Sequence, residues 1–355
     1  MLRLALSVVL AAVVVGCGGR GDPSEADVIR SVDDELSTLP DPGPGLGEGA
    51  PAIATTGWRT DFAKRSVPLS EFQSGGPGKD GIPAIDDPSF AAVPDVDFLQ
   101  PREPVLVVEV DGDVRAYPLQ ILIWHEIVND VVGGVPVAVT FCPLCNTAIV
   151  FDRRIAGRTL DFGTTGNLRN SDLVMYDRQT ESWWQQFGGR ALVGHYVGKE
   201  LRQLAARIVA WDDFEREYAE GRVLSRDTGH SRPYGRNPYQ GYDDAASPPF
   251  FPAAGQDDKR LLPKDRVVFV ERAGEAVAIP FSALERRRVV RVVVGGRRLV
   301  VRWRPGVASA LDSGAIAEGR AVGAPEVLED GRLVPFDQPF WFAVAAFRPN
   351  VRVVR

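Results

Sequence analysis

The amino-acid sequence predicts a strand-dominated α+β fold built on two copies of one hairpin-helix-hairpin unit. Residues 105–118 read VLVVEVDGDVRAYP and residues 267–280 read VVFVERAGEAVAIP, a shift of 162 residues (267 − 105) that holds without a gap over about forty positions. About a third of these positions are identical, and they include the glycines and prolines that fix backbone shape. Runs of β-branched residues between turn signals make up most of each copy, which favours strands.

Each copy is predicted to begin with a β-hairpin and to continue into a helix. In the first copy, residues 105–110 are rich in valine, an Asp-Gly turn signal follows, and residues 114–117 return as a second strand. Pro118 suits the first turn of a helix, and apolar residues recur at helical spacing up to Asn129. A Gly-Gly turn then predicts a second hairpin. The remaining predicted elements are strands at 130–132, 135–141, 173–176 and 192–197 and a short helix at 211–220.

Length and composition predict a globular protein. The chain has 355 residues, of which 45% are hydrophobic, and this suffices for a substantial core. The folded region is expected at residues 56–355, with the first copy at about 100–200 and the second at about 262–349. The formal net charge is −6, and no Lys/Arg-rich stripe is recognised, so nucleic acid is not expected as a partner.

The N-terminus is predicted to direct export and membrane attachment. Residues 4–15 form an apolar run behind Arg3 that is too short to span about 30 Å of hydrocarbon, which is typical of a signal peptide. Residues 14–17, Val-Val-Gly-Cys, resemble a bacterial lipobox, although leucine is more usual at the first position. Residues 1–17 are therefore predicted to be a signal peptide with a lipobox, and Cys17 the lipidated residue, with ordinary secretion as the alternative.

Residues 18–55 are predicted to be a flexible tether. They are rich in Gly, Pro, Ser and Asp, a composition that buries too little apolar surface to fold. The protein is therefore expected in the bacterial cell envelope, outside the cytoplasmic membrane and held to a membrane through its lipid.

The reactive side chains occur in the first copy only. Apart from Cys17, the chain contains two cysteines, Cys142 and Cys145, which form a CxxC motif at the end of a predicted strand. The second copy has Arg304 and Val307 at the corresponding positions but keeps the proline between them. A cysteine pair required by the fold of the unit should have recurred, so the motif indicates a function.

Three interpretations of the CxxC motif stay open. In the first, Cys142 and Cys145 bind copper, or alternatively zinc, with His125 as a third ligand and His195 or His230 as a fourth. In the second, they form a redox-active dithiol, which the spacing and an oxidising compartment permit. In the third, they form a small structural disulfide.

Further side chains are candidates for a ligand pocket near this motif. Asn129 lies one helical turn beyond His125 and is expected to orient its ring. His195 lies within a predicted strand and is expected to be structural. The long loop 224–242 contains His230 and is expected to shape or cover the pocket with its tyrosines. The other pocket candidates are Glu126, Asp172, Trp183, Trp184, Tyr234, Tyr239 and Tyr242.

Several separated motifs occur in an order that resembles one bacterial family. They lie at residues 124–130, 140–147, 171–178 with Ser182-Trp183, 224–242 and 340–347. Over about residues 81–349 the chain resembles the family catalogued as domain of unknown function 3179. This resemblance implies exported, often lipid-anchored bacterial proteins and no established activity.

The sequence therefore favours a membrane-anchored envelope lipoprotein that binds copper or zinc in its first copy. The alternatives are a thiol-disulfide redox protein and a non-enzymatic ligand-binding module that uses the aromatic loop, with the cysteines as a structural disulfide. No general base with an unambiguous partner stands out, although Glu126 and Asp172 are candidates, so no reaction is predicted.

Overall fold

The computed structural model describes residues 53–355. The predicted signal peptide, Cys17 and nearly all of the predicted tether lie outside these residues. Strands dominate, and the described part contains four α-helices of seven residues each, which confirms the predicted strand-dominated α+β class. None of these helices has the length and apolar character needed to cross a membrane.

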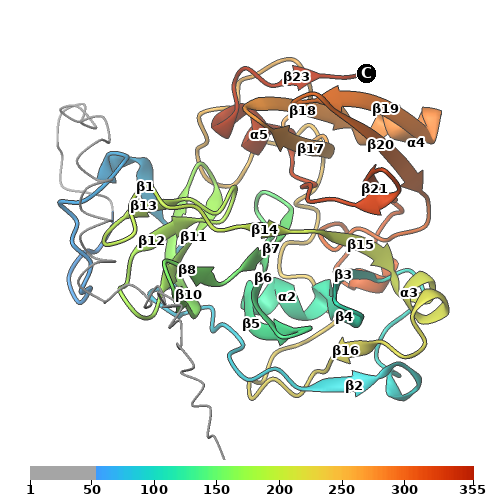
Figure 1. The fold of residues 1–355 in the computed structure, drawn as a ribbon, viewed down its shortest axis with the longest axis horizontal. Helices are drawn as coiled ribbons and strands as arrows, with labels where there is room; N and C mark the ends of the chain where they lie inside the picture. Colours follow the sequence, from blue (N-terminus) through green and yellow to red (C-terminus); the bar gives the residue numbers. More distant parts are fainter. Residues whose placement is uncertain (1–52) are drawn as a thin grey trace, which may run out of the picture. The chain divides into compact units, whose positions relative to one another are not determined.

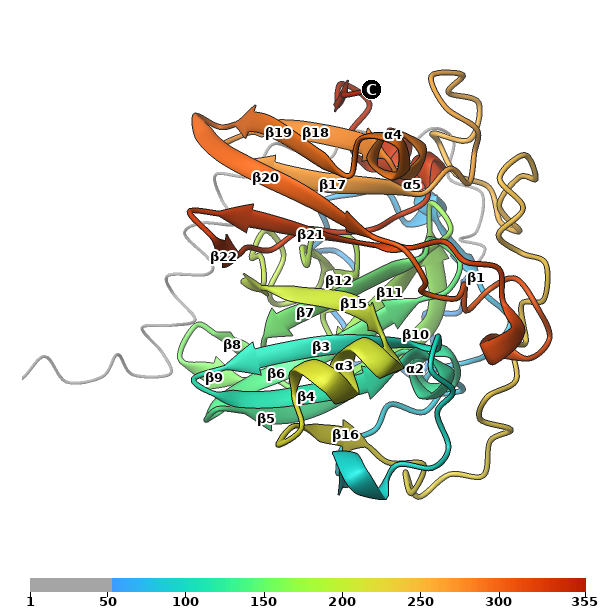
Figure 2. The same cartoon turned by 90° about the vertical axis from the view of Figure 1, so that its right-hand side faces the viewer.

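The same succession of elements occurs in both segments that the sequence repeat relates. The first contains β3 (Pro104–Val110), β4 (Asp113–Pro118), α2 (Leu119–His125), β5 (Ile127–Val132) and β6 (Val135–Cys142). The second contains β17 (Val267–Arg272), β18 (Glu275–Pro280), α4 (Phe281–Arg287), β19 (Val289–Val294) and β20 (Arg297–Arg304). Strand register agrees as well, because Val105 pairs with Pro118 and Val267 with Pro280. Figures 1 and 2 show the second segment above the first.

Helix α2 ends earlier than the sequence predicts. Glu126 has a φ of 59°, which redirects the chain from α2 into β5, and Arg288 makes the same turn after α4 with a φ of 62°. Residues 127–129, predicted to be helical, therefore pair with β6 as a strand. A positive φ is uncommon for residues other than glycine, so packing rather than residue preference sets this turn.

The remaining strands complete five larger sheets and one two-stranded sheet. One sheet has the order β1 (Phe72–Ser74), β10 (Phe162–Arg169), β11 (Asp172–Asp177), β12 (Trp183–Gln185) and β13 (Ala191–Val193). A second joins β14 (Gln203–Leu204) and β7 (Thr147–Asp152) to β6 and β5. A third places β15 (Ala206–Ala210) beside β3, β16 (Arg222–Leu224) beside β4, and β2 (Phe90–Ala92) beside β16.

Two sheets lie around the second segment. Strand β23 (Arg352–Val353) pairs with β18, while β21 (Ala324–Glu329) and β22 (Arg332–Leu333) continue the sheet of β19 and β20. The smallest sheet is β8 (Arg154–Ile155) with β9 (Arg158–Thr159). The other helices are α3 (Trp211–Glu217), α5 (Trp341–Phe347) and the short 3-10 turns Leu69–Glu71, Val93–Asp95 and Ile316–Glu318.

One sequence prediction about an extended segment needs correction. The polar segment 163–172 lies mostly in β10, where Thr164, Thr165 and Asn167 are buried and hydrogen-bonded. The strand predicted at 192–197 ends at Val193 in β13, and His195 lies in the turn that follows. Gly194 adopts a positive φ at this turn, which glycine does readily. A Cβ at this position would also come close to the Ser182 backbone.

The CxxC motif lies inside a hydrophobic cluster rather than at the surface. Cys142 and Cys145 belong to the same cluster as Phe141, Trp184 and Phe340. The backbone N–H of Phe340, just before α5, donates to the carbonyl of Cys145 at 2.9 Å. The closing segment of the chain therefore packs directly on the turn that carries the cysteines.

Candidate metal centre

The two cysteines lie at the tip of the hairpin formed by β6 and β7. Cys142 ends β6 and pairs with Thr147, which begins β7, so Cys145 lies in the tight turn between them. Both thiols are free and buried, with exposed fractions of 1% and 0%. A tight turn holds the two sulfur atoms on the same side of the hairpin, which is the requirement for sharing one ion.

Asp172, the first residue of β11, supplies a third ligand atom. One carboxylate oxygen of Asp172 and the sulfur atoms of Cys142 and Cys145 all lie within 4.8 Å of one another. The Sγ of Cys145 is 2.8 Å from Oδ1 of Asp172 and 2.9 Å from Oγ1 of Thr147. These three ligand atoms are called the Cys-Cys-Asp group below.

Neutral donors hold Asp172 in place. Its Oδ2 accepts hydrogen bonds from the Nε2 of Gln185 and, at 2.9 Å, from the backbone N–H of Phe187. Oδ1 is the oxygen that faces the sulfur of Cys145. Among the described residues, no ion pair reaches Asp172. Oδ2 is thus anchored, while Oδ1 remains available to a metal ion. Carboxylates in metal sites are oriented by surrounding hydrogen bonds in the same way.

Burial raises the pKa values of all members of this group. The pKa of Asp172 is raised to about 6, with burial as the main cause. The pKa of the Cys142 thiol is raised by burial, and that of Cys145 is raised further by burial, its hydrogen bond with Cys142 and the negative charge of Asp172. Without a cation the thiols stay protonated, whereas a bound cation would stabilise the thiolates and the carboxylate together.

The histidines predicted as ligands lie elsewhere, which corrects the proposed ligand set. His125 donates from Nδ1 to the carbonyl of Pro83 at 2.7 Å, and its Nε2 accepts from the hydroxyl of Tyr234 at 2.6 Å. His230 is exposed, and its ring centroid lies 5.3 Å from that of His125. Both ring nitrogens of His125 are engaged, so this histidine is not a ligand. The third ligand atom is a carboxylate oxygen of Asp172 instead of the imidazole nitrogen that the sequence predicted.

Glu126 is a second buried carboxyl close to the Cys-Cys-Asp group. Its pKa is raised to about 8, first by burial and then by the negative charge of Asp172, and Glu126 in turn raises the pKa of Cys142. Among residues 53–355 its carboxylate makes no hydrogen bond or ion pair. A buried carboxyl with no partner beside a candidate metal centre is suited to exchange a proton or to act as an additional ligand.

The aromatic loop 224–242 contacts the CxxC turn through Tyr242. The hydroxyl of Tyr242, which is 2% exposed, donates to the carbonyl of Leu144 at 2.8 Å, inside the CxxC turn. Burial is the main cause of the raised pKa values of Tyr239 and Tyr242, and the neighbouring Cys142 raises both further. Tyr234 belongs instead to the hydrogen-bonded pair with His125.

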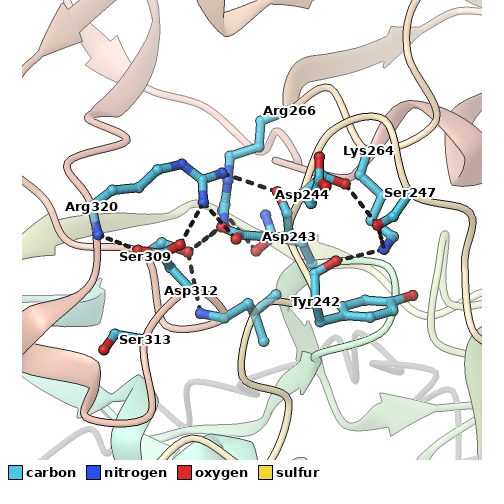
Figure 3. Close-up of polar contacts among 12 residues, drawn as sticks. Tyr242, Asp243, Asp244, Ser247, Lys264, Arg266, Ser309, Asp312, Ser313 and Arg320 are labelled. Carbon is cyan, nitrogen blue, oxygen red and sulfur yellow. Dashed lines mark hydrogen bonds and ion pairs between the residues drawn. The ribbon is translucent and has the colours of Figure 1, made fainter.

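A buried ionic network fixes the end of this loop (Figure 3). Asp243 accepts hydrogen bonds from Arg266 at 2.9 Å, from Arg320 at 2.6 Å and from Ser309. The other Nη of Arg266 donates to Oδ1 of Asn146 in the CxxC turn at 2.8 Å. The network therefore joins the loop, the cysteine turn and the second half of the chain.

The other pocket candidates have structural contacts. Asn129 does not orient His125; its side chain exchanges hydrogen bonds with the backbone of Phe162 and thereby joins β5 to β10. Trp184 donates from Nε1 to Asp177 at 3.0 Å, and Trp183 is fully buried, with its ring edge-on to aromatic neighbours.

Polar residues that sequence reasoning missed surround the group. Thr147 donates to Oε1 of Gln186 at 2.6 Å, and Nε2 of Gln186 donates to Thr140 at 2.9 Å. Buried glutamines at 185 and 186, directly after two tryptophans, were the sequence signal for this network. Gln185 and Phe187 also line a cavity of about 380 Å³, so the residues that hold Asp172 form part of a cavity wall.

Comparison with known proteins supports the resemblance that the sequence motifs suggested. No curated protein and no solved structure matches the chain. One family model matches residues 79–351, which is most of the chain and includes both segments of the repeat and every residue of the Cys-Cys-Asp group. The chain belongs to the family described as Protein of unknown function (DUF3179).

Proposed function

We propose that this chain is an envelope protein, attached to a membrane through Cys17, that binds one transition-metal ion through Cys142, Cys145 and Asp172. The observation that carries the metal proposal is the buried Cys-Cys-Asp group, whose ligand atoms lie within 4.8 Å of one another. The anchored Oδ2 of Asp172 supports it further, because its two donors orient Oδ1 toward the sulfur atoms.

Zinc is the ion that this ligand set favours. Two thiolates suit both zinc and copper(I), but the third ligand is a carboxylate oxygen, which suits Zn(II) better than soft copper(I). Copper, the first choice from the sequence, becomes the second. Three protein ligands also leave a fourth position for water or a substrate, and the carboxyl of Glu126 is the nearby group that could exchange a proton with it.

Metal analysis of the full-length protein tests this proposal. We expect about one equivalent of zinc in the wild-type protein and at least roughly tenfold weaker binding in Cys142→Ser and Asp172→Asn, because each removes a ligand. Asp177→Asn is the matched control, since Asp177 is a buried aspartate of the same strand outside the group. Equal zinc affinity in the wild type and in both ligand variants would contradict the proposal.

The redox alternative has weaker support. A thiol-disulfide exchange protein needs an accessible thiolate, whereas Cys142 and Cys145 are buried and their thiol pKa values are raised by burial. Titration with a thiol reagent separates the two functions. Protection that only a chelator removes indicates a metal centre, and protection that only a reductant removes indicates a disulfide.

A further inference from the structure

Residues 286–304, at the end of α4 and along β19 and β20, form an arginine-rich surface. This stretch contains eight arginines, whereas the corresponding residues 124–142 of the first copy contain no arginine or lysine. This arginine-rich stretch differs from the sequence-based expectation that the chain has no Lys/Arg-rich stripe. Because the two segments share the same elements and register, the fold does not require these charges.

Strand β19 presents valine and arginine to solvent on one face. Its residues alternate, with Val290, Val292 and Val294 buried in the hydrophobic core of the second copy. Val289 and Val293 are 39% and 51% exposed, and Arg291 between them is exposed as well. Apolar and cationic side chains therefore lie side by side on the same open face.

The edge of the equivalent strand is paired in the first copy. Ile85 donates its N–H to the carbonyl of Ile127 and accepts from the N–H of Asn129, so the chain near Ile85 runs along β5. Ile127 and Asn129, the counterparts of Val289 and Arg291, are buried, whereas Val131, the counterpart of Val293, is 47% exposed. In the second copy β19 is an edge strand, and Figures 1 and 2 show it at the margin of the described chain.

Most of the arginines have no partner within the described chain. Three form ion pairs, Arg297 with Glu329, Arg302 with Glu326 and Arg304 with Glu217. Among residues 53–355, the side chains of the other five make no ion pair or hydrogen bond; these are Arg286, Arg287, Arg288, Arg291 and Arg298. A cluster of unpaired cations on a chain of net charge −6 attracts an anionic surface.

We propose that this arginine-valine surface docks on an anionic phospholipid membrane. A guanidinium group can donate two parallel hydrogen bonds to two oxygens of one phosphate. The exposed valines between the arginines can enter the boundary between headgroups and acyl chains. The proposal rests on the proposed membrane attachment through Cys17.

The test places an environment-sensitive fluorophore on the surface of the full-length protein through Val293→Cys. The native Cys142 and Cys145 are buried, and a second label at Leu262→Cys, also 51% exposed, is the matched control. Vesicles of phosphatidylcholine alone are compared with vesicles that also contain phosphatidylglycerol. We expect the label at 293, and not that at 262, to shift to the blue with phosphatidylglycerol and to lose this shift at ~0.5 M salt.

A variant with four substitutions defines the role of charge. Arg286→Gln, Arg287→Gln, Arg291→Gln and Arg298→Gln together should weaken the response by at least about tenfold without changing the circular dichroism spectrum. The proposal is overturned if the label at 293 responds equally to both vesicle types, or if the labels at 293 and 262 respond equally. It is also overturned if the charge variant responds as strongly as the wild type. A label at 293 that does not respond to vesicles but does respond to polyglutamate overturns the proposal in favour of an acidic protein partner. Flotation with vesicles reports the lipid anchor separately, so an anchored protein with a silent label refutes docking alone.

Discussion

The carboxylate of Asp172 shows that a single hydrogen-bonded side chain can define a candidate ligand set. It lies 27 residues beyond Cys145, in another sheet, and meets the sulfur of Cys145 because β11 and the hairpin of β6 and β7 pack together. His125, in contrast, lies close to the cysteines along the repeat unit but is held by Pro83 and Tyr234. Proximity in the secondary structure is therefore a weak guide to which side chains share a site.

Burial of neutral His125 predicts a pH-dependent stability. Its pKa is lowered from 6.5 to about 4, mainly by burial, while its hydrogen bond to Pro83 opposes the shift and the charges of His230 and Arg232 add to it. The unfolded chain takes up this proton near pH 6.5, whereas the folded chain takes it up only near pH 4. The contribution of His125 to the free energy of unfolding is therefore fully present above pH 6.5 and falls by about 3 kcal/mol between pH 6.5 and 4.

Urea unfolding of His125→Gln at several pH values measures this contribution. We expect the difference in unfolding free energy between wild type and variant to shrink by most of that amount as the pH falls from 7 to 4. His230→Gln replaces an exposed histidine whose charge is a smaller cause of the lowered His125 pKa than burial, so it should reduce the slope of the wild type only slightly. Parallel pH curves for the wild type and His125→Gln would contradict the assigned protonation state.

At the scale of elements, one turn decides where helix and strand meet in both segments. The hairpins were predicted correctly because Asp-Gly and Gly-Gly turns are local signals. The end of α2 was not, because Glu126 and Arg288 take positive φ values that no residue preference indicates. Apolar residues 127 and 128 continued the helical spacing, but their burial belongs to the strand pairing with β6.

Glycine at position 288 should relieve this turn. Arg288→Gly removes the Cβ that disfavours a φ of 62° and should raise the unfolding free energy by about 0.5–1 kcal/mol, since glycine adopts positive φ readily. Arg287→Gly, one residue earlier and inside α4, should lower it by about 1 kcal/mol. Thermal unfolding of the two variants compares them directly, and a loss of stability in both would show that the turn is not strained.

At the scale of the whole molecule, the buried network of Asp243 joins parts that are distant in sequence. Asp243 is fully buried, and its partners Arg266, Ser309 and Arg320 come from the segment that contains the second copy. Arg266 also reaches Asn146 beside the cysteines. The position of the CxxC turn therefore depends on residues more than 100 positions away along the chain.

Removal of Asp243 should destabilise the fold strongly. Asp243→Ala leaves two arginines without their buried partner and is expected to lower the unfolding free energy by about 3–5 kcal/mol. Asp312→Ala, which removes a more exposed partner of Arg320, should cost less than about 1 kcal/mol. Chemical denaturation of both variants provides the comparison, and similar losses would show that burial of the network contributes little.

The sequence by itself determined the strand-dominated class, the hairpins, the family and the place of the reactive cysteines in the first segment of the repeat. These features follow from residue spacing, turn chemistry and the comparison of the two copies, all of which can be read from the order of residues without knowing how the sheets pack. Only the tertiary structure decided that Asp172 rather than His125 accompanies the sulfur atoms and that β19 leaves an arginine face open. Such pairings depend on how separate sheets pack, and packing brings together residues whose spacing in the sequence has no fixed period.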